Sequence, residues 1–225
     1  MKISVIIPVL NEEKVLQKTL QRLKKGADLE LIVVDGGSLD STPAIARAFT
    51  RKVFTSPPGR ARQMNEGARQ AEGEILLFLH ADSQIAPGGL GKIVPAITGG
   101  QALGGAFRLA IDSQNIFLRM IAWFANLRTA ITEIPYGDQG IFITRSAFEK
   151  MGGFPDIPLM EDVEFSKKMK RAGKIVLLKE KIATSPRRWE KEGIFLTTLK
   201  NWTLLACYLL GVPAERLSAW YRNVR

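Results

Sequence analysis

Four short apolar segments alternate with helical stretches along the first 80 residues, and this alternation constrains the fold more than any other feature. The segments cover residues 3–8, 29–34, 52–55 and 75–79. Strands that are apolar throughout, rather than on every second residue, are usually buried on both faces. Separated by helices, they indicate a mostly parallel sheet with helices on either side. The sequence therefore predicts an α/β fold.

The second half of the chain continues this alternation less regularly. A helix over 161–172 is indicated by its acidic first turn, by basic residues near its end and by the Gly173 that follows. Further strands and helices are predicted at 103–109, 115–131, 140–144, 175–178 and 192–212. The chain of 225 residues suits one α/β domain with a small appendage.

The balance of charge restricts the class of partner. The chain has 32 Lys and Arg against 22 Asp and Glu, a net charge of +10, which favours anionic partners such as nucleotides or acidic lipid headgroups. The basic residues are dispersed, and no zinc-finger spacing, basic tail or RNA-binding aromatic signature is present. We therefore expect no nucleic acid partner. The single cysteine, Cys207, and the lack of a recognisable signal peptide favour a cytoplasmic location.

Polar clusters follow three of the predicted strands, at residues 8–12, 35–38 and 80–83. In open parallel sheets, ligands bind beyond the carboxyl ends of the strands. Because the three clusters are predicted to meet at one edge of the sheet, together they indicate a ligand site more strongly than any one of them alone.

The cluster at residues 80–82 contains the only histidine of the chain. In an extended segment His80 and Asp82 point the same way, so both can reach one ligand. A carboxylate suits Mg²⁺ or Mn²⁺ held jointly with phosphate oxygens. The alternative is a strand end whose polar side chains make local hydrogen bonds, and the tripeptide alone favours that alternative.

The other candidate segments each have an ordinary structural reading as well. Asp35 with Gly36 and Gly37 allows close approach of a ligand to the backbone, or forms a tight turn. Asn11 and Glu12 contact a nucleotide, or cap a helix. The stretch with Arg60 and Asn65 offers cations to anionic groups, or is a solvated helix face. Glu161 and Asp162 supply a base, or complement a helix dipole.

Taken in order, these segments resemble the family 2 inverting glycosyltransferases of GT-A fold, over about residues 1–190. The resemblance rests on SVIIPVLNEE, IVVDGGSLDST, GRARQMNEGA, FLHADS, GDQGIFITR, GGFPDIPLMEDVEF and RRW. The chain looks closest to the short bacterial members that are sometimes found beside radical-SAM genes. The resemblance implies a Rossmann-like, mostly parallel central sheet flanked by helices, with C-terminal helices.

The resemblance also assigns roles to residues. Asp162 matches the general base, beside Glu161, and Asp82 matches the metal ligand, with His80 beside it. The nucleotide-sugar contacts expected on this basis are Pro8, Asn11, Glu12, Asp35, Gly37, Arg60, Asn65, His80, Ala81, Asp82, Arg188 and Trp189.

Three positions depart from the family pattern. His80 stands where the acidic triplet normally begins with Asp, Gly36 replaces an acid after Asp35, and Ser185 falls where the Gln of QxxRW is usual. The transmembrane helices of processive synthases are also missing from this sequence. These differences favour transfer of a single sugar over polymer synthesis.

The expected organisation is a GT-A domain over 1–190, with a nucleotide-sugar half over about 1–110, an acceptor half over 111–190 and a helical extension over 191–225. The expected reaction moves one sugar from a nucleoside diphosphate sugar, UDP-linked, to an acceptor hydroxyl, with Mg²⁺ or Mn²⁺ as cofactor. The alternatives are a sugar-phosphate nucleotidyltransferase and a non-catalytic nucleotide- or membrane-binding module. The first would normally carry a glycine-rich loop with Arg and Lys after its first strand, and residues 8–13 contain none of these.

The apolar stretch over 193–212 raises the question of membrane contact. It is 20 residues long, which approaches a membrane span, but Lys200 near its middle disfavours insertion. We expect a helix packed on the catalytic domain. The second reading is peripheral contact with the inner face of the cell membrane through 193–225, where Trp202 and Trp220 suit an interface, and a lipid-linked acceptor would fit it. The third reading is a helix that spans the membrane.

Overall fold

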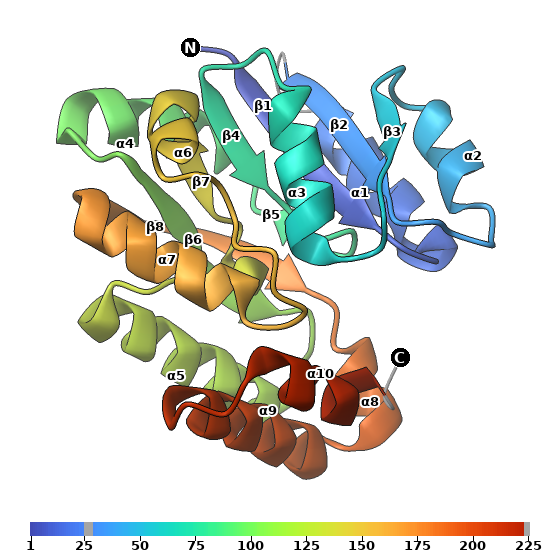
Figure 1. The fold of residues 1–225 in the computed structure, drawn as a ribbon, viewed down its shortest axis with the longest axis vertical. Helices are drawn as coiled ribbons and strands as arrows, with labels where there is room; N and C mark the ends of the chain where they lie inside the picture. Colours follow the sequence, from blue (N-terminus) through green and yellow to red (C-terminus); the bar gives the residue numbers. More distant parts are fainter. Residues whose placement is uncertain (25–28, 223–225) are drawn as a thin grey trace.

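The computed structural model describes residues 1–24 and 29–222 and contains one eight-stranded sheet flanked by helices (Figure 1). The strands are β1 (Ile3–Val9), β2 (Leu29–Asp35), β3 (Val53–Thr55), β4 (Ile75–Phe78), β5 (Gln84–Ile85), β6 (Gly104–Ile111), β7 (Phe142–Thr144) and β8 (Ile175–Thr184). The helices are α1 (Glu13–Lys24), α2 (Thr42–Arg47), α3 (Arg60–Arg69), α4 (Ile93–Gly100), α5 (Ile116–Thr132), α6 (Arg145–Lys150), α7 (Glu161–Ala172), α8 (Arg187–Glu192), α9 (Ile194–Leu209) and α10 (Ala214–Arg222). Two short 3₁₀ turns, η1 (Leu90–Lys92) and η2 (Gly137–Gln139), lie between them.

The sheet has the order β3-β2-β1-β4-β7-β6-β8-β5. Strands β3, β2, β1 and β4 run parallel, as their uninterrupted apolar runs predict. The second half mixes directions, because β7 is antiparallel to both β4 and β6, whereas β6 and β8 are parallel. The predicted α/β fold is confirmed. One sheet joins the two predicted halves, because β7 pairs with β4 and β6, and β8 pairs with β6 and β5.

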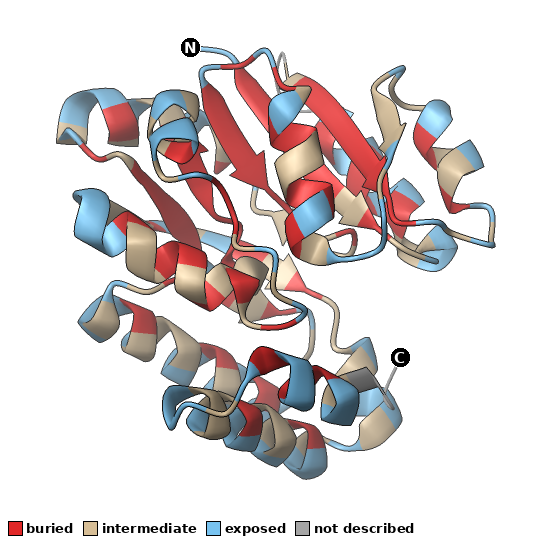
Figure 2. Cartoon of the chain, in the orientation of Figure 1, coloured by how far each residue is buried: buried red, intermediate tan, exposed pale blue. Residues whose placement is uncertain are grey.

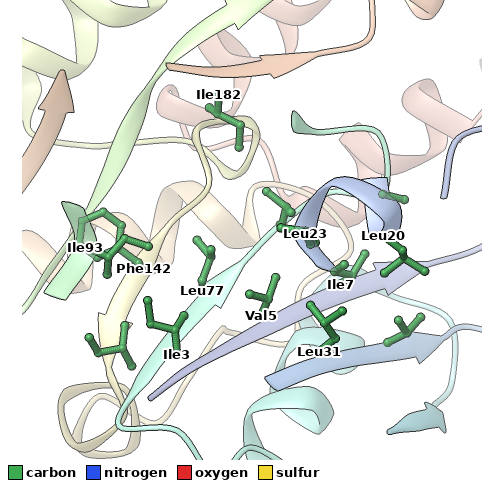
Figure 3. Packing of buried hydrophobic residues seen from close by; sticks show 14 of the residues in the cluster. Ile3, Val5, Ile7, Leu20, Leu23, Leu31, Leu77, Ile93, Phe142 and Ile182 are labelled. Carbon is green, nitrogen blue, oxygen red and sulfur yellow. The ribbon is translucent and has the colours of Figure 1, made fainter. Parts of the chain in front are cut away.

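Alternate side chains of the central strands pack against different helix layers. Val5 and Ile7 of β1 face α1, where Leu16 and Leu20 are buried, whereas Ile6 of the same strand faces α3 (Figure 3). Full burial of an aliphatic side chain of this size contributes about 1.5–3 kcal/mol. Figure 2 shows the result, a buried sheet between helices that are exposed on their outer sides.

A cluster of aromatic side chains fixes α7 against the sheet. Phe165 of α7 stacks on Phe154 with ring centroids 4.1 Å apart, and both rings contact Phe78 at the end of β4. All three are buried. This packing holds the first turn of α7, with Glu161 and Asp162, at a fixed place beside the end of β4.

The C-terminal segment contains the helix predicted over 192–212 as α9, and a short helix that was not predicted, α8, precedes it. The chain turns at Gly193, whose φ of 88° belongs to the left-handed region that favours glycine, and this turn separates α8 from α9. Strand β8 is also longer than predicted, because its second half pairs with β6 and β5. Leu204 of α9 and Leu217 of α10 pack on Leu159 in the loop before α7, so the helices are packed on the rest of the fold, as expected. None of the helices within residues 1–24 and 29–222 is long and apolar enough to cross a membrane.

Candidate active site

The three polar clusters predicted at strand ends do lie at one edge of the sheet, because β2, β1 and β4 are parallel neighbours. The loops after β1 and β2 are also joined directly. The Asn11 N–H donates to Ser38 Oγ over 2.8 Å, and the Leu39 N–H donates to Asn11 Oδ1 over 2.9 Å. The predicted convergence is confirmed for these segments.

Asp35 shapes the loop in which it lies. Its buried carboxylate accepts hydrogen bonds from the Gly37 N–H at 3.1 Å and from the Ser38 N–H at 3.0 Å. Gly37 has a φ of 94°, a conformation that requires glycine here. The tight-turn reading of this segment therefore holds, and contact between Asp35 and a nucleotide remains a prediction. Pro8 lies one strand away in β1, in register with Val34.

Asp82 lies close to a cation that the sequence does not single out. The side chain of Asp82 is only 15% exposed, and Arg187 Nε lies 3.5 Å from its Oδ2. The same guanidinium pairs with Glu12, with Nη1 2.7 Å from Oε2. Burial, the largest influence, raises the pKa of Asp82, and nearby Glu12 raises it further, whereas Arg187 and Arg60 lower it; the net shift is upward. Arg187 thus bridges two carboxylates of the strand-end site.

Arg60, the first residue of α3, is surrounded by acids from three other parts of the chain. Burial is the largest influence and lowers the pKa of Arg60, but opposing fields raise it above its usual value. These fields come from Glu161, Tyr221, Asp162 and Asp82. The predicted metal ligand Asp82 and the predicted base Asp162 lie 80 residues apart in sequence, and the charges of both raise the pKa of Arg60.

Asp162 is oriented by the turn η2. The Gly137 N–H donates to Asp162 Oδ2 over 2.7 Å. A methyl group placed on Gly137 would lie 3.1 Å from that oxygen and also 3.1 Å from His80 Nε2. Gly137 therefore lies between Asp162, the predicted base, and His80, which is predicted to bind the metal beside Asp82. Because Gly137 has no side chain, both residues can approach its backbone.

Asp138, the next residue, is a candidate that the sequence reasoning did not assign, although it lies in the quoted stretch GDQGIFITR. Burial first, and then the negative field of Asp162, raise its pKa from 3.8 to about 6, while Arg128 and Arg60 act in the opposite direction. Arg128 in turn stacks on the Tyr136 ring, 3.2 Å from its centroid. The signal that could have found Asp138 is a polar pair between Gly137 and Gly140 just before a buried strand.

The raised pKa of Asp138 makes stability depend on pH. Because the folded state holds this proton more tightly than the unfolded state, the contribution of Asp138 is lost as pH rises from about 4 through about 6. We expect Asp138→Asn to be more stable than the parent protein at pH 8, with the difference shrinking towards pH 4. The urea concentrations at which the two proteins are half unfolded, compared at pH 4.5, 6 and 8, measure this difference in stability. A difference that does not change with pH contradicts the raised pKa.

Two of the predicted nucleotide contacts are engaged within the protein. The Asn65 amide donates from Nδ2 to the Phe154 carbonyl and accepts the Phe154 N–H at Oδ1, both over 2.9 Å. The Ala81 carbonyl accepts a hydrogen bond of 2.7 Å from Thr19 Oγ1. Asn65 thereby ties α3 to the loop before α7, and Ala81 ties the end of β4 to α1.

Arg188 and Trp189 face the C-terminal helices. The Arg188 guanidinium lies over the Tyr221 ring, 4.4 Å from its centroid, and Trp189 Nε1 donates to Thr198 Oγ1 of α9. It is the neighbouring Arg187 that reaches the strand-end site. A role for Arg188 and Trp189 in donor binding remains a prediction.

The residues at this edge fit a metal ion only as part of a ternary complex. Among the described residues, no group of three or more His, Cys, Asp and Glu side chains is placed to hold an ion. Asp82 offers a carboxylate beside His80, so an ion there would take its other ligands from phosphate oxygens and water. This is the way Mg²⁺ is commonly held beside substrate phosphates.

The fold and the strand-end clusters together define an α/β protein whose polar residues gather at the carboxyl edge of its sheet, the edge at which such sheets bind ligands. A family model described as "Glycosyl transferase family 2" matches residues 4–152, more than half of the chain, so the protein belongs to this family. The "Probable glycosyltransferase YdaM" of Bacillus subtilis is 29% identical over 193 residues, covering 73% of this chain and 46% of that protein.

Solved structures share the fold. S. aureus TarS 1-349 in complex with UDP-GlcNAc has a TM-score of 0.66 at 22% identity, covering 82% of this chain and 58% of that chain. The mannosyltransferase PcManGT from Pyrobaculum calidifontis, in complex with GDP-Man and Mn²⁺, has a TM-score of 0.65 at 22% identity, covering 81% and 56%. The chain therefore spans less than two thirds of the length of these relatives.

Proposed function

We propose that this protein transfers one sugar from a nucleoside diphosphate sugar, UDP-linked, to an acceptor hydroxyl with inversion at the anomeric carbon. The observation that carries the proposal is that Arg187 bridges Asp82 and Glu12 at the strand ends, while Gly137, which orients Asp162, lies close to His80 as well. The aromatic cluster holds the helix of Asp162 against the sheet, and the charges of Asp82, Glu161 and Asp162 all raise the pKa of Arg60. Membership of the family supports this reading.

Asp162 acts as the general base in this proposal. The acceptor oxygen attacks the anomeric carbon, the bond from that carbon to the diphosphate oxygen breaks, and the hydroxyl proton passes to the Asp162 carboxylate. The hydrogen bond from the Gly137 N–H fixes the orientation of this carboxylate. In-line attack on an α-linked donor gives a β-linked product.

The leaving diphosphate gathers negative charge, which cations at the strand ends stabilise. A divalent ion, Mg²⁺ or Mn²⁺, would be held by Asp82 with His80 and would offset that charge. Arg187 Nε lies 3.5 Å from Asp82 Oδ2, and the charges of Arg187 and Arg60 both act to lower the pKa of Asp82. Arg62 is engaged elsewhere, with Nε 2.8 Å from Asp156 Oδ1. The complexes with UDP-GlcNAc and with GDP-Man and Mn²⁺ support this assignment of donor and metal.

A panel of nucleotide sugars tests the proposal. The purified protein is incubated with UDP-, GDP- and dTDP-linked sugars and either Mg²⁺ or Mn²⁺, and nucleotide release and product mass are measured. We expect release of UDP with a UDP-linked donor, increased by acceptor and lost with a chelator. Release of pyrophosphate from a sugar phosphate and UTP would instead show a nucleotidyltransferase. Donor binding without turnover of any donor would favour the non-catalytic module. We also propose a cytoplasmic location and, as one class of acceptor, a lipid-linked hydroxyl.

A further inference from the structure

Two helices on one side of the molecule expose large apolar side chains to solvent. These helices, α5 and α9, lie next to each other in the lower part of Figure 1, and their outer sides are largely exposed in Figure 2. The exposed residues are Ile116, Phe117, Met120, Trp123, Phe124, Leu127 and Ile131 on α5, and Phe195, Leu196, Leu199, Trp202 and Leu209 on α9. Large contiguous apolar patches are rare on the surface of soluble monomeric proteins, and where they occur they commonly mark an interaction site.

The two helices form one continuous surface, here called the α5–α9 face. The rings of Phe117 and Phe195 are in contact with centroids 5.4 Å apart. Ile194 at the start of α9 packs beside Leu118 and Ala122 of α5. The α5–α9 face therefore extends well beyond residues 193–225, where the sequence suggested membrane contact.

An apolar groove opens between α5 and the sheet beside the α5–α9 face. Its volume is about 750 Å³, and its lining includes Arg108, Ile111, Met120, Trp123, Leu127 and Lys181. A groove of this size accommodates a hydrocarbon chain. Three basic residues line it, Arg108, Arg119 and Lys181, and two of them, Arg108 and Lys181, lie side by side on neighbouring strands.

These two basic residues are adjacent and lack acidic partners. Arg108 of β6 and Lys181 of β8 are direct partners in the strand register, and both are exposed. Within the described part of the chain, neither side chain takes part in an ion pair. Like charges directly opposite on a sheet repel each other, so an anionic group at this place would relieve the repulsion.

The charge of the helices agrees with an anionic partner. The 17 residues of α5 and the 16 residues of α9 contain Arg119, Arg128 and Lys200 but no acid. Arg128 is turned towards Tyr136, which leaves Arg119 and Lys200 as the cations of the two helices that can meet a partner. A second copy of this chain, docked through the same face, would bring one positively charged surface onto another. Three tryptophans are also exposed on this side, Trp123 and Trp202 at 59% and Trp220 at 57%. Tryptophan is favoured at the boundary between lipid headgroups and acyl chains.

We propose that the α5–α9 face docks on an anionic phospholipid bilayer, with Arg108 and Lys181, which line the groove, binding lipid phosphates. The helices lie in the interface and do not cross the membrane. The face is joined to the candidate active site, because α9 and α10 pack on Leu159 and Met160, directly before Glu161. Docking would therefore present an acceptor at the bilayer surface to Asp162, a consequence that rests on the proposed function, whereas the docking itself does not.

Vesicle flotation of the full chain tests the proposal. The probes are vesicles of neutral phosphatidylcholine alone and vesicles with about one third phosphatidylglycerol, at 0.1 M salt. The test variant is Arg108→Glu/Lys181→Glu. The matched control is Lys14→Glu/Lys18→Glu, which reverses two exposed cations of α1 and lowers the net charge of +10 by the same four units.

We expect the parent protein and the α1 control to float with the anionic vesicles. The test variant should partition at least tenfold less, since each cation near an anionic surface contributes about 1 kcal/mol, or about fivefold. The double variant Trp123→Ala/Trp202→Ala should weaken binding as well. Both tryptophan side chains are exposed, so these substitutions leave the buried core unchanged. Circular dichroism verifies the fold of each variant.

Three results would overturn the proposal. They are failure of the parent to float with anionic vesicles, equal loss in the α1 control, and a stable dimer in light scattering that the tryptophan variant abolishes. UDP binding, measured by calorimetry on the same variants, separates this proposal from the proposed function. If a variant no longer floats but binds UDP as the parent does, the substitution has affected membrane docking alone. If the parent floats but does not bind UDP, the result counts against the proposed donor site and not against docking.

Discussion

Replacing Asp162 by asparagine is expected to lower kcat for sugar transfer by about 10²–10⁴-fold, the range that general acid–base catalysis contributes. The amide keeps the size of the carboxylate, and its one oxygen can still accept the hydrogen bond from the Gly137 N–H, although the second bond, from the Val163 N–H, then loses its acceptor. What it loses is the ability to take the acceptor proton. The dissociation constant for UDP should stay within about twofold of the parent value.

A second acid in the same helical turn provides the control. Glu164 also lies in the first turn of α7, where its carboxylate pairs with Lys167 Nζ at 2.7 Å. Glu164→Gln removes the same charge from the same helix end and should leave kcat within about twofold. If Asp162→Asn keeps most of the parent kcat, or if both variants lose activity equally, Asp162 is not the base.

The second large effect is expected at Asp82. Asp82→Asn should lower kcat/KM by about 10²-fold or more, because a divalent ion supplies several kcal/mol of charge stabilisation to the leaving group. The variant should also bind Mn²⁺ more weakly in the presence of UDP, which electron paramagnetic resonance measures without turnover. Its remaining activity should respond little to added metal.

An exposed acid in the loop before α7 is the matching control for this variant. Asp156 pairs with Arg62 at 2.8 Å, and both side chains are more than half exposed. Exposed pairs of this kind contribute about 0–1 kcal/mol, so Asp156→Asn should keep parent activity and Mn²⁺ affinity. Full metal-dependent activity in Asp82→Asn would show that the ion is held elsewhere or is not used.

The parts of the fold that the sequence predicts well are those with local signals. The bounds of α7 match the predicted 161–172, because an acidic first turn and a terminal glycine mark its two ends. The meeting of the strand-end clusters follows from the parallel direction of β1, β2 and β4, which their apolar character indicates. Where the information is non-local, as in the second half of β8, the prediction ends too early.

Arg187 shows why part of the site could not be predicted. The resemblance directs attention to Arg188 and Trp189, and a short helix carries all three residues. Which of two adjacent arginines points to Glu12, 175 residues earlier, depends on the rotation of α8 about its axis. That rotation is set by packing of Trp189 against α5 and α9, and no local pattern reports it. Asp138 was missed for a similar reason, since its pKa is raised first by burial in the folded chain and then by Asp162 of another helix.

The opposite directions of Arg187 and Arg188 have a mechanical consequence. One holds Glu12 and Asp82 at the end of the sheet, and the other lies against Tyr221 of α10. Because both belong to one rigid turn of helix, a rotation of α8 that alters the first set of contacts also alters the second. Any ligand that changes the Arg187 contacts through a rotation of α8 would therefore act on the Tyr221 contact as well, and linkage requires that such an effect be reciprocal.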